Sequence, residues 1–286
     1  MKNQLPIIGL FIITIIYGFT NIVYRFISNV NFLLVAFLLM LFSTIILLPI
    51  LKITKSLKEI RHLKKKKWLF ILGVVTATIW FTIYFSTTNT MIANAVFGFI
   101  TSPIFVVVLS PFLLKENINR KIGIAFVISL IGIILIFDPI KILQSVISIG
   151  GLAGLLMGFS SGMNSIAGRK LKDDYSPYSL VFLGSLIGMI LLAPTLFFID
   201  LSIPSLYFIL VILLISIIGV TGGIAIFYSL KYIKAQSVSI ILLLEPLISI
   251  IAALIIFSEV PSILTILGGA LLLGADVIII KQSKEN

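Results

Sequence analysis

The chain alternates between long apolar runs and short polar connectors. Ten runs reach the length of about 20 residues that a helix needs to cross the hydrocarbon layer of a bilayer. The runs lack the strict apolar–polar alternation of membrane β-barrel strands. They cover residues 5–27, 32–51, 68–87, 92–114, 120–137, 149–168, 178–199, 205–230, 235–257 and 262–280. The pattern predicts an all-α polytopic membrane protein with ten transmembrane helices.

Basic residues gather in the connectors on one side of this predicted bundle. If the N-terminus lies in the cytoplasm, all 21 Lys and Arg residues except Arg25 and Lys141 fall in cytoplasmic segments. Cytoplasmic loops of membrane proteins are enriched in Lys and Arg. We therefore expect a plasma-membrane protein with cytoplasmic N- and C-termini. The net charge of +11 is interpreted as a topology signal beside an anionic leaflet, and no nucleic-acid partner is expected.

The composition also limits the chemistry. A content of 60% hydrophobic and 11% charged residues is far from that of soluble domains, in which about a quarter of residues are charged. The lipid bilayer is therefore the expected environment, and its apolar contact surface is also compatible with a homo-oligomer. The chain has no cysteine, and its single histidine, His62, lies in the basic connector. No metal site, cofactor or catalytic residue is expected.

Scarce polar residues and prolines repeat at an offset of half the chain. Pro103 and Glu116 have the same spacing as Pro246 and Glu259. The same offset relates Asn21 to Asn164, Thr78 to Thr221 and Ser86 to Ser229. Each half holds five spans, an odd number, so the second half enters the membrane inverted relative to the first. We expect two inverted five-helix repeats, residues 1–143 and 144–286, joined near Asp138–Gly151, with a shared cavity near the midplane.

The repeated residues resemble the EamA-type members of the drug/metabolite transporter superfamily. Each unit has a mid-helix proline, a glutamate further on and then a helix rich in small residues. The first unit reads Ser102-Pro103, Glu116, Gly123 and Gly132, and the second reads Leu244-Glu245-Pro246, Glu259, Gly268-Gly269 and Gly274. Tyr17-Gly18 matches an aromatic–glycine pair of the first helix. The resemblance implies a secondary carrier, usually an exporter of amino acids or other small metabolites. In agreement, the chain lacks a P-loop for ATP.

Polar and aromatic residues within the spans are the candidates for a substrate site. Polar side chains in membrane helices prefer the bundle interior or a wet cavity, where they either bind a ligand or bond between helices. Trp80 and Tyr84 share a helix face, as do Asn94 and Thr101. The full set is Tyr17, Asn21, Trp80, Tyr84, Asn94, Thr101, Ser160, Asn164, Tyr228, Gln236 and Ser239.

Glu245 is the candidate for proton coupling. A carboxylate at mid-membrane costs at least ~2.5–3.5 kcal/mol unless it is paired, protonated or wet. Pro246 removes a backbone donor and is expected to leave the Leu242 carbonyl without its helical partner. Glu245 could therefore carry a proton or satisfy the bent helix. Helical geometry places Glu245 about 180° from Gln236, so both face one narrow cavity only if the helix bends. Glu116 and Glu259 are expected to be structural, at helix N-termini.

The leading hypothesis is a secondary transporter, an exporter of a small polar metabolite such as an amino acid, that works by alternating access and is proton-coupled or facilitative. A lipid-linked substrate flippase in the same fold is an alternative. A membrane-embedded lipid-modifying enzyme is a weaker one, because the only acids within the spans are Glu245 and Asp276 and such chemistry needs clustered acids, histidines or a nucleophile.

Overall fold

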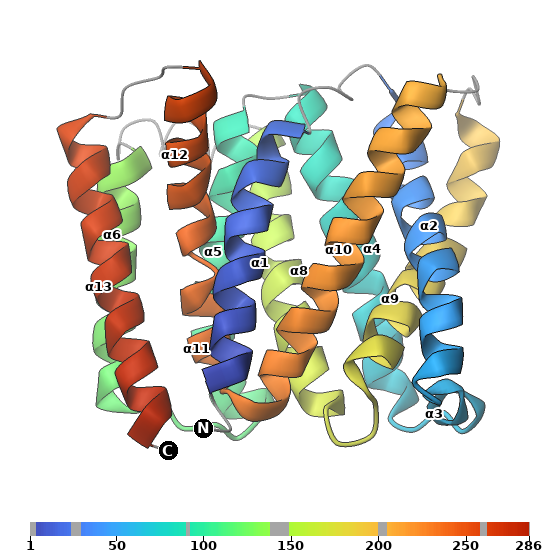
Figure 1. The fold of residues 1–286 in the computed structure, drawn as a ribbon, viewed down its shortest axis with the longest axis horizontal. Coiled ribbons are helices and arrows are strands. Elements are labelled where there is room, and N and C mark those ends of the chain that lie inside the picture. The colour runs from blue at the N-terminus through green and yellow to red at the C-terminus, as the bar shows by residue number, and fades with distance from the viewer. Residues whose placement is uncertain are drawn as a thin grey trace.

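The computed structural model is a bundle of long helices (Figure 1). It describes residues 4–23, 30–89, 92–137, 149–199, 205–257 and 262–285, and some side chains within them, such as those of Asn21 and Asn94, fall outside the description. The described part is helical, without a β-strand. The prediction of an all-α polytopic membrane protein is confirmed.

Each predicted span corresponds to a helix or a pair of helices. In the first half they are α1 (Gln4–Val23), α2 (Phe32–Ile53), α4 (Lys66–Asn89), α5 (Ile92–Leu113) and α6 (Arg120–Phe137), with a short α3 (Leu57–Arg61) in the basic connector. In the second half they are α8 (Ile149–Leu171), α9 (Pro177–Leu192), η2 (Ala193–Phe198), α10 (Leu206–Tyr232), α11 (Ala235–Ile241), α12 (Leu244–Phe257) and α13 (Ile263–Glu285). The ninth span is thus two helices, α11 and α12.

Helix starts are fixed by local side-chain caps. Asn31 accepts a hydrogen bond from the Leu33 amide at the start of α2. Ser176 accepts one from the Ser179 amide at the start of α9, where Pro177 occupies the first turn. Such caps satisfy amides that have no partner inside the helix. The predicted boundaries were accurate to a few residues because these polar residues and prolines lie next to the apolar runs.

The helix contacts show the internal symmetry of the bundle. Helix α1 packs against α10 and α12, and its counterpart in the second half, α8, packs against α4 and α5. Helices α2 and α9 are counterparts and contact each other, as do α6 and α13. Each of these contacts between a helix of the first half and a helix of the second half therefore has a counterpart between the two equivalent helices of the opposite halves. This is the pattern that two inverted five-helix repeats produce.

The bundle has one strongly basic end. Helix α1 starts there, α3 lies there, and α13 ends there (Figure 1). The connector 54–65 and the turns between α8 and α9 and between α10 and α11 lie at the same end, which we call the basic end.

Apolar side chains cover the outside of the bundle. Phe112, Phe197 and Phe198 are 78%, 90% and 87% exposed, an exposure that suits contact with lipid rather than water. By length and composition alone, six described stretches could cross a membrane: Phe32–Ile53, Lys66–Phe85, Pro177–Phe198, Leu206–Tyr232, Ala235–Ile256 and Ile263–Gln282. The shorter apolar helices Leu5–Thr20 and Thr101–Leu113 lie among them. The chain is an integral membrane protein.

Glycines bring the two copies of the fifth helix into backbone contact. A Cβ atom placed on Gly132 of α6 would lie 2.7 Å from the Gly268 carbonyl oxygen of α13, so no side chain fits between these helices. A Cβ on Gly269 would instead lie 2.6 Å from the Leu247 side chain of α12. Gly268 and Gly269 of the last span thus let α13 approach its neighbours closely. A Cβ on Gly274 would meet open space.

Candidate functional site

The two halves enclose a cavity of about 180 Å³ at the centre of the bundle. Both halves contribute to its walls, through α1, α2, α4 and α5 on one side and α8 to α12 on the other. Its polar and aromatic lining consists of Tyr17, Ser43, Thr76, Trp80, Ser102, Ser161, Asn164, Ser165, Ser185, Phe227, Ser239 and Glu245. A shared site between inverted repeats was the expectation from the sequence, and the cavity lies there.

Glu245 reaches this cavity through a break in the ninth span. Helix α11 ends at Ile241 and α12 begins at Leu244. The Leu242 carbonyl accepts a hydrogen bond from the Glu245 amide at 3.1 Å, so it is not left without a donor as the sequence had suggested. Glu245 therefore lies in the first turn of α12, where the helix dipole favours a negative charge. Its exposed fraction is only 8%.

Two aromatic rings form part of the wall because α10 has glycines opposite them. A Cβ on Gly222 would overlap the Tyr17 hydroxyl group, and a Cβ on Gly219 would lie 3.1 Å from Trp80 Cζ2. The missing side chains let both rings lie directly against the α10 backbone. Tyr17 comes from α1 and Trp80 from α4, so the rings enter the cavity from two different helices of the first repeat.

An amide–hydroxyl pair crosses between the repeats in the cavity wall. Asn164 Nδ2 of α8 donates a hydrogen bond to Thr76 Oγ1 of α4 at 3.0 Å. Several other buried hydroxyl groups bond to a carbonyl of their own helix, as Thr44 does to Met40. The Ser161 hydroxyl group has no hydrogen-bond partner within the described residues, so it is available to a ligand.

The structure gathers five of the predicted site residues around the cavity, namely Tyr17, Trp80, Asn164, Ser239 and Glu245. It places others beside it. Thr101 and Ser160 are buried and adjacent in sequence to the lining residues Ser102 and Ser161. Tyr84 is buried in an apolar cluster with Phe208 and Ile212. Tyr228 packs edge to face on Tyr232 near the end of α10. The side chains of Asn21 and Asn94 lie outside the described part.

Most of the hydroxyl groups that line the cavity were not predicted from the sequence. Ser43, Thr76 and Ser185 lie in largely apolar spans, and Ser165 directly follows Asn164. A lone serine in an apolar helix carries little signal, because it can bond back to its own helix. Ser102 and Ser161 are adjacent to the predicted site residues Thr101 and Ser160, so the sequence pattern indicated their neighbourhood.

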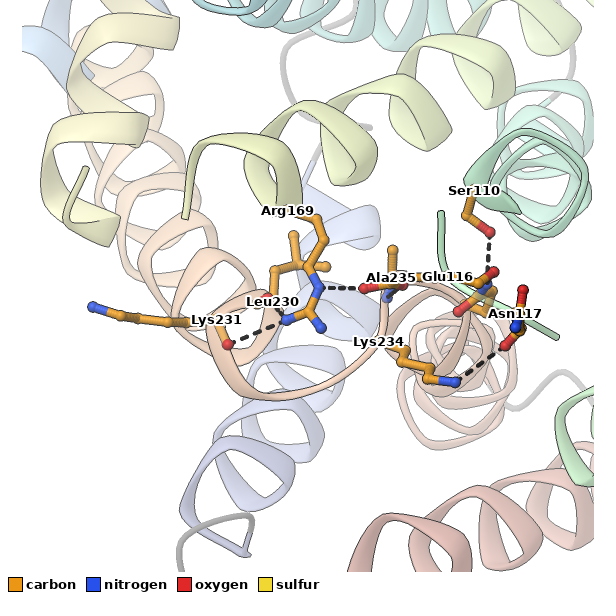
Figure 2. A network of polar contacts seen from close by, with 9 residues as sticks. Ser110, Glu116, Asn117, Arg169, Leu230, Lys231, Lys234 and Ala235 are labelled. Carbon is orange, nitrogen blue, oxygen red and sulfur yellow. Dashed lines mark hydrogen bonds and ion pairs between the residues drawn. The ribbon is translucent and has the colours of Figure 1, made fainter. Parts of the chain in front are cut away.

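Below the cavity, toward the basic end, a polar network joins the two repeats (Figure 2). Arg169 Nε, at the end of α8, pairs with Glu116 Oε1 at 2.6 Å, and the two side chains are only 12% and 14% exposed. Arg169 also donates to the carbonyls of Leu230 and Lys231 at the end of α10. The second oxygen of Glu116 accepts the Ala235 amide at 3.3 Å. We call these contacts the basic-end network.

Gln236 belongs to this network rather than to the described cavity lining. Its Nε2 atom donates to Ser110 Oγ at 2.6 Å and to the Glu116 carbonyl at 3.4 Å. Lys234 adds a bond to the Asn117 carbonyl at 3.1 Å. Gln236 and Glu245 thus do not share one face, because they lie on either side of the break between α11 and α12.

Glu116 has a different structural role from the one its position suggested. Helix α6 begins at Arg120 and is capped by Asn119, whose side chain accepts the Ile122 amide at 2.9 Å. Glu116 lies one turn too early to act on this helix end. Instead it pairs across the repeats with Arg169, a contact between residues 53 positions apart. Its repeat counterpart Glu259 lies outside the described residues.

The network lies beside the cavity lining, one to two turns further along four of the helices. On each of four helices, a cavity residue is followed toward the basic end by a network residue. The pairs are Ser102 and Ser110 on α5, Ser165 and Arg169 on α8, Phe227 and Leu230 on α10, and Ser239 and Gln236 on α11. At a rise of about 1.5 Å per residue, the offsets correspond to roughly 5–12 Å along the helices. On these four helices the network therefore lies nearer the basic end than the cavity lining does.

A second, more exposed contact joins the repeats at the same end. Asp174, in the turn after α8, pairs with Lys65 Nζ at 2.8 Å and with Lys64 Nζ at 3.5 Å. The hydrogen bond from Lys65 holds the pKa of Asp174 below its usual range. The Lys64 and Lys65 side chains are 70% and 41% exposed, so water screens this contact much more than the pair of Arg169 and Glu116.

Inverted helical repeats with a shared cavity at their interface are typical of secondary transporters. The chain belongs to the EamA-like transporter family, whose model matches it twice, over residues 4–138 and 148–281. The predicted resemblance is confirmed. The match of one family model to each half also agrees with the symmetry of the helix contacts.

Similar proteins carry transporter names. An S-adenosylmethionine uptake transporter of Rickettsia prowazekii is 27% identical over 261 residues, covering 88% of this chain and 84% of that protein. An uncharacterized transporter of Clostridium kluyveri is 24% identical over 266 residues, covering 88% and 84%. A solved crystal structure with 16% sequence identity superposes with a TM-score of 0.73 over 96% of this chain and 97% of the other. At that identity the likeness shows the fold alone.

Proposed function

We propose that the protein is a proton-coupled secondary transporter that exports a small polar metabolite, such as an amino acid, across the plasma membrane. The observation that carries the proposal is the central cavity, which residues of both repeats line and next to which the basic-end network ties the repeats together. A binding site at the repeat interface that is closed at one end is what alternating access requires.

The placement of charge supports an orientation for this cycle. Cytoplasmic loops are enriched in Lys and Arg, so we assign the basic end, with both chain termini, to the cytoplasm. We infer that the paired Arg169 and Glu116 belong to a state that is closed toward the cytoplasm. Rocking of one repeat against the other would separate Arg169 from Glu116 and open the cavity inward.

Glu245 supplies a site for coupling. It is the only carboxylate among the described residues of the cavity lining. A proton that binds to Glu245 from the outer side and is released into the cytoplasm would carry the substrate-free transporter back to its cytoplasm-facing state. The transporter could then bind another substrate molecule. Because the proton gradient across a bacterial plasma membrane points inward, this exchange would drive export.

Counterflow in proteoliposomes tests the proposal. Purified protein is reconstituted in vesicles preloaded with one unlabelled metabolite at a time, and entry of the same labelled metabolite is followed. We expect at least one amino acid, amine or nucleoside-containing solute to enter faster than in protein-free vesicles. If every metabolite enters at the protein-free rate while a labelled lipid crosses between leaflets, the protein is a flippase and the proposal is wrong.

A further inference from the structure

We infer that the connector between α2 and α4 is a binding surface for the headgroups of anionic phospholipids. Its basic side chains, which we call the lipid patch, are those of Lys52, Lys55, Lys58, Arg61, Lys66 and Lys67. This inference goes beyond the proposed function and does not depend on it, because it concerns the outer surface at the basic end and not the cavity.

The charge of this connector is almost entirely of one sign. Residues 52–67 contain eight Lys and Arg residues but a single acid, Glu59. Glu59 accepts the backbone amide just before α9 at 2.7 Å, and the nearby Asp174 pairs with Lys64 and Lys65. The six residues of the lipid patch are exposed and form no ion pair within the part of the chain that the structure describes. Clusters of four to eight basic residues next to a membrane span are typical of anionic-lipid binding.

The connector lies where two long apolar helices reach the membrane surface. Ile53 is the last residue of α2, and Lys66 is the first residue of α4. Ile53, Leu57 and Leu63 are 80%, 38% and 40% exposed. Apolar side chains that alternate with lysines suit the boundary between headgroups and acyl chains, and Trp68, in the first turn of α4, belongs to a residue type enriched at that boundary. A soluble anion would leave these apolar side chains in water, so a lipid fits the surface better than a free phosphate or a nucleic acid.

Contacts with the second repeat hold the connector in place. The Tyr175 hydroxyl group, in the turn after α8, accepts the Lys64 amide at 2.6 Å and donates to the Lys64 carbonyl at 2.9 Å. Ser176 Oγ donates to Ser56 Oγ at 3.1 Å. Because Tyr175 is only 3% exposed, its hydroxyl group anchors the connector to a packed part of the bundle. The backbone that carries the lipid patch is therefore preorganised, and a headgroup has to order only the basic side chains.

Fluorescence quenching by brominated lipids tests this inference. The chain has two tryptophans, and Trp68 directly follows Lys66 and Lys67 of the lipid patch. The Trp80→Phe variant therefore leaves Trp68 as the sole indole reporter, beside the patch. The protein is reconstituted in vesicles of phosphatidylcholine with a minor share of phosphatidylglycerol. In one set the phosphatidylglycerol carries brominated chains, and in the other an equal share of the phosphatidylcholine does. The ratio of quenching in the two sets measures how far the anionic lipid is enriched beside Trp68.

We expect phosphatidylglycerol to be enriched about fivefold or more at low salt, which corresponds to one Lys or Arg contact with a headgroup, and less at high salt. Lys58→Gln combined with Arg61→Gln in α3 should remove most of this enrichment. Arg120→Gln combined with Lys281→Gln is the matched control, because it also removes one exposed Lys and one exposed Arg. These two residues belong to α6 and α13, which lie at the opposite side of the bundle from α3 (Figure 1), so the control should keep the enrichment.

Three results would contradict the inference. Equal quenching by the two lipids in the parent would show that the connector does not select anionic lipid. An equal loss in the test and control variants would show that net charge, and not the lipid patch, sets the preference. If sn-glycerol 3-phosphate abolishes the enrichment while sodium chloride of equal ionic strength does not, the surface is a site for a soluble phosphate. Native mass spectrometry of the unmodified chain in detergent, titrated with the same two lipids, repeats the comparison without the Trp80→Phe variant, and equal retention of the two lipids there would also overturn the inference.

Discussion

Replacement of Glu245 by glutamine is expected to abolish the accumulation of substrate driven by a pH gradient, while exchange at saturating substrate continues. Glutamine keeps the size of the side chain and its hydrogen-bonding capacity but cannot bind and release a proton. The carboxyl group is buried, lies in the cavity wall and occupies the first turn of α12. The hydroxyl groups, Asn164 and the aromatic rings remain in place, so the empty and loaded carrier can still change state.

The measurement compares two assays on the same vesicles. Labelled substrate is followed in proteoliposomes with an imposed pH gradient and, separately, under counterflow without one. The Glu245→Gln variant should equilibrate its substrate but not concentrate it, and its half-saturating concentration should rise. Asp276→Asn is the matched control, since Asp276 is the other buried carboxylate of the described spans and lies outside the described cavity lining. A Glu245→Gln variant that still concentrates substrate would rule Glu245 out as the proton carrier.

Loss of the Arg169–Glu116 ion pair is expected to open the cavity toward the basic end. Removing one partner of a buried pair leaves the other charge without compensation, at a cost of about 3–5 kcal/mol, and both side chains here are largely buried. Glu116→Gln also weakens the acceptor for the Ala235 amide. The closed arrangement should therefore lose population, because an opened network lets water reach the Arg169 guanidinium group.

Thiol labelling measures this opening without interference, since the chain has no native cysteine. In the Glu116→Gln background, a cysteine placed at Ser161 should react faster with a membrane-impermeant maleimide added on the basic side. The exchanged pair Glu116→Arg with Arg169→Glu should return the labelling rate toward that of the parent. Asp174→Asn is the control, because it removes a more exposed ion pair at the same end, worth about 1 kcal/mol or less. Equal labelling rates in the parent and in Glu116→Gln would show that the pair does not hold the cavity closed.

Much of this architecture could be predicted from the order of residues. Apolar runs, prolines and caps are local signals, so the helix boundaries followed from them. The inverted repeat followed from residues such as Pro103 and Pro246, which are rare enough that their common offset is informative. Glu245 was found because a carboxylate in the middle of an apolar span is costly.

The features that were missed depend on contacts between distant residues or on the rotation of helices. The pairing of Glu116 with Arg169 joins the connector before α6 to the end of α8 in the other repeat, and no local pattern indicates it. The break at Leu242 and Leu243 changes which side chains face the cavity, and so it separates Gln236 from Glu245. Serines such as Ser43 and Ser185 line the cavity only because of how their helices are rotated in the bundle.

The central claim is that one cavity opens in turn to the two sides of the membrane. Its most direct test is a single cysteine at Ser161, a lining residue whose hydroxyl group bonds to no other described residue. Labelling with a membrane-impermeant maleimide is measured in right-side-out and in inside-out vesicles. The account predicts that the cysteine reacts from both sides, and that substrate slows both reactions. Reaction from one side alone, with or without substrate, would contradict it.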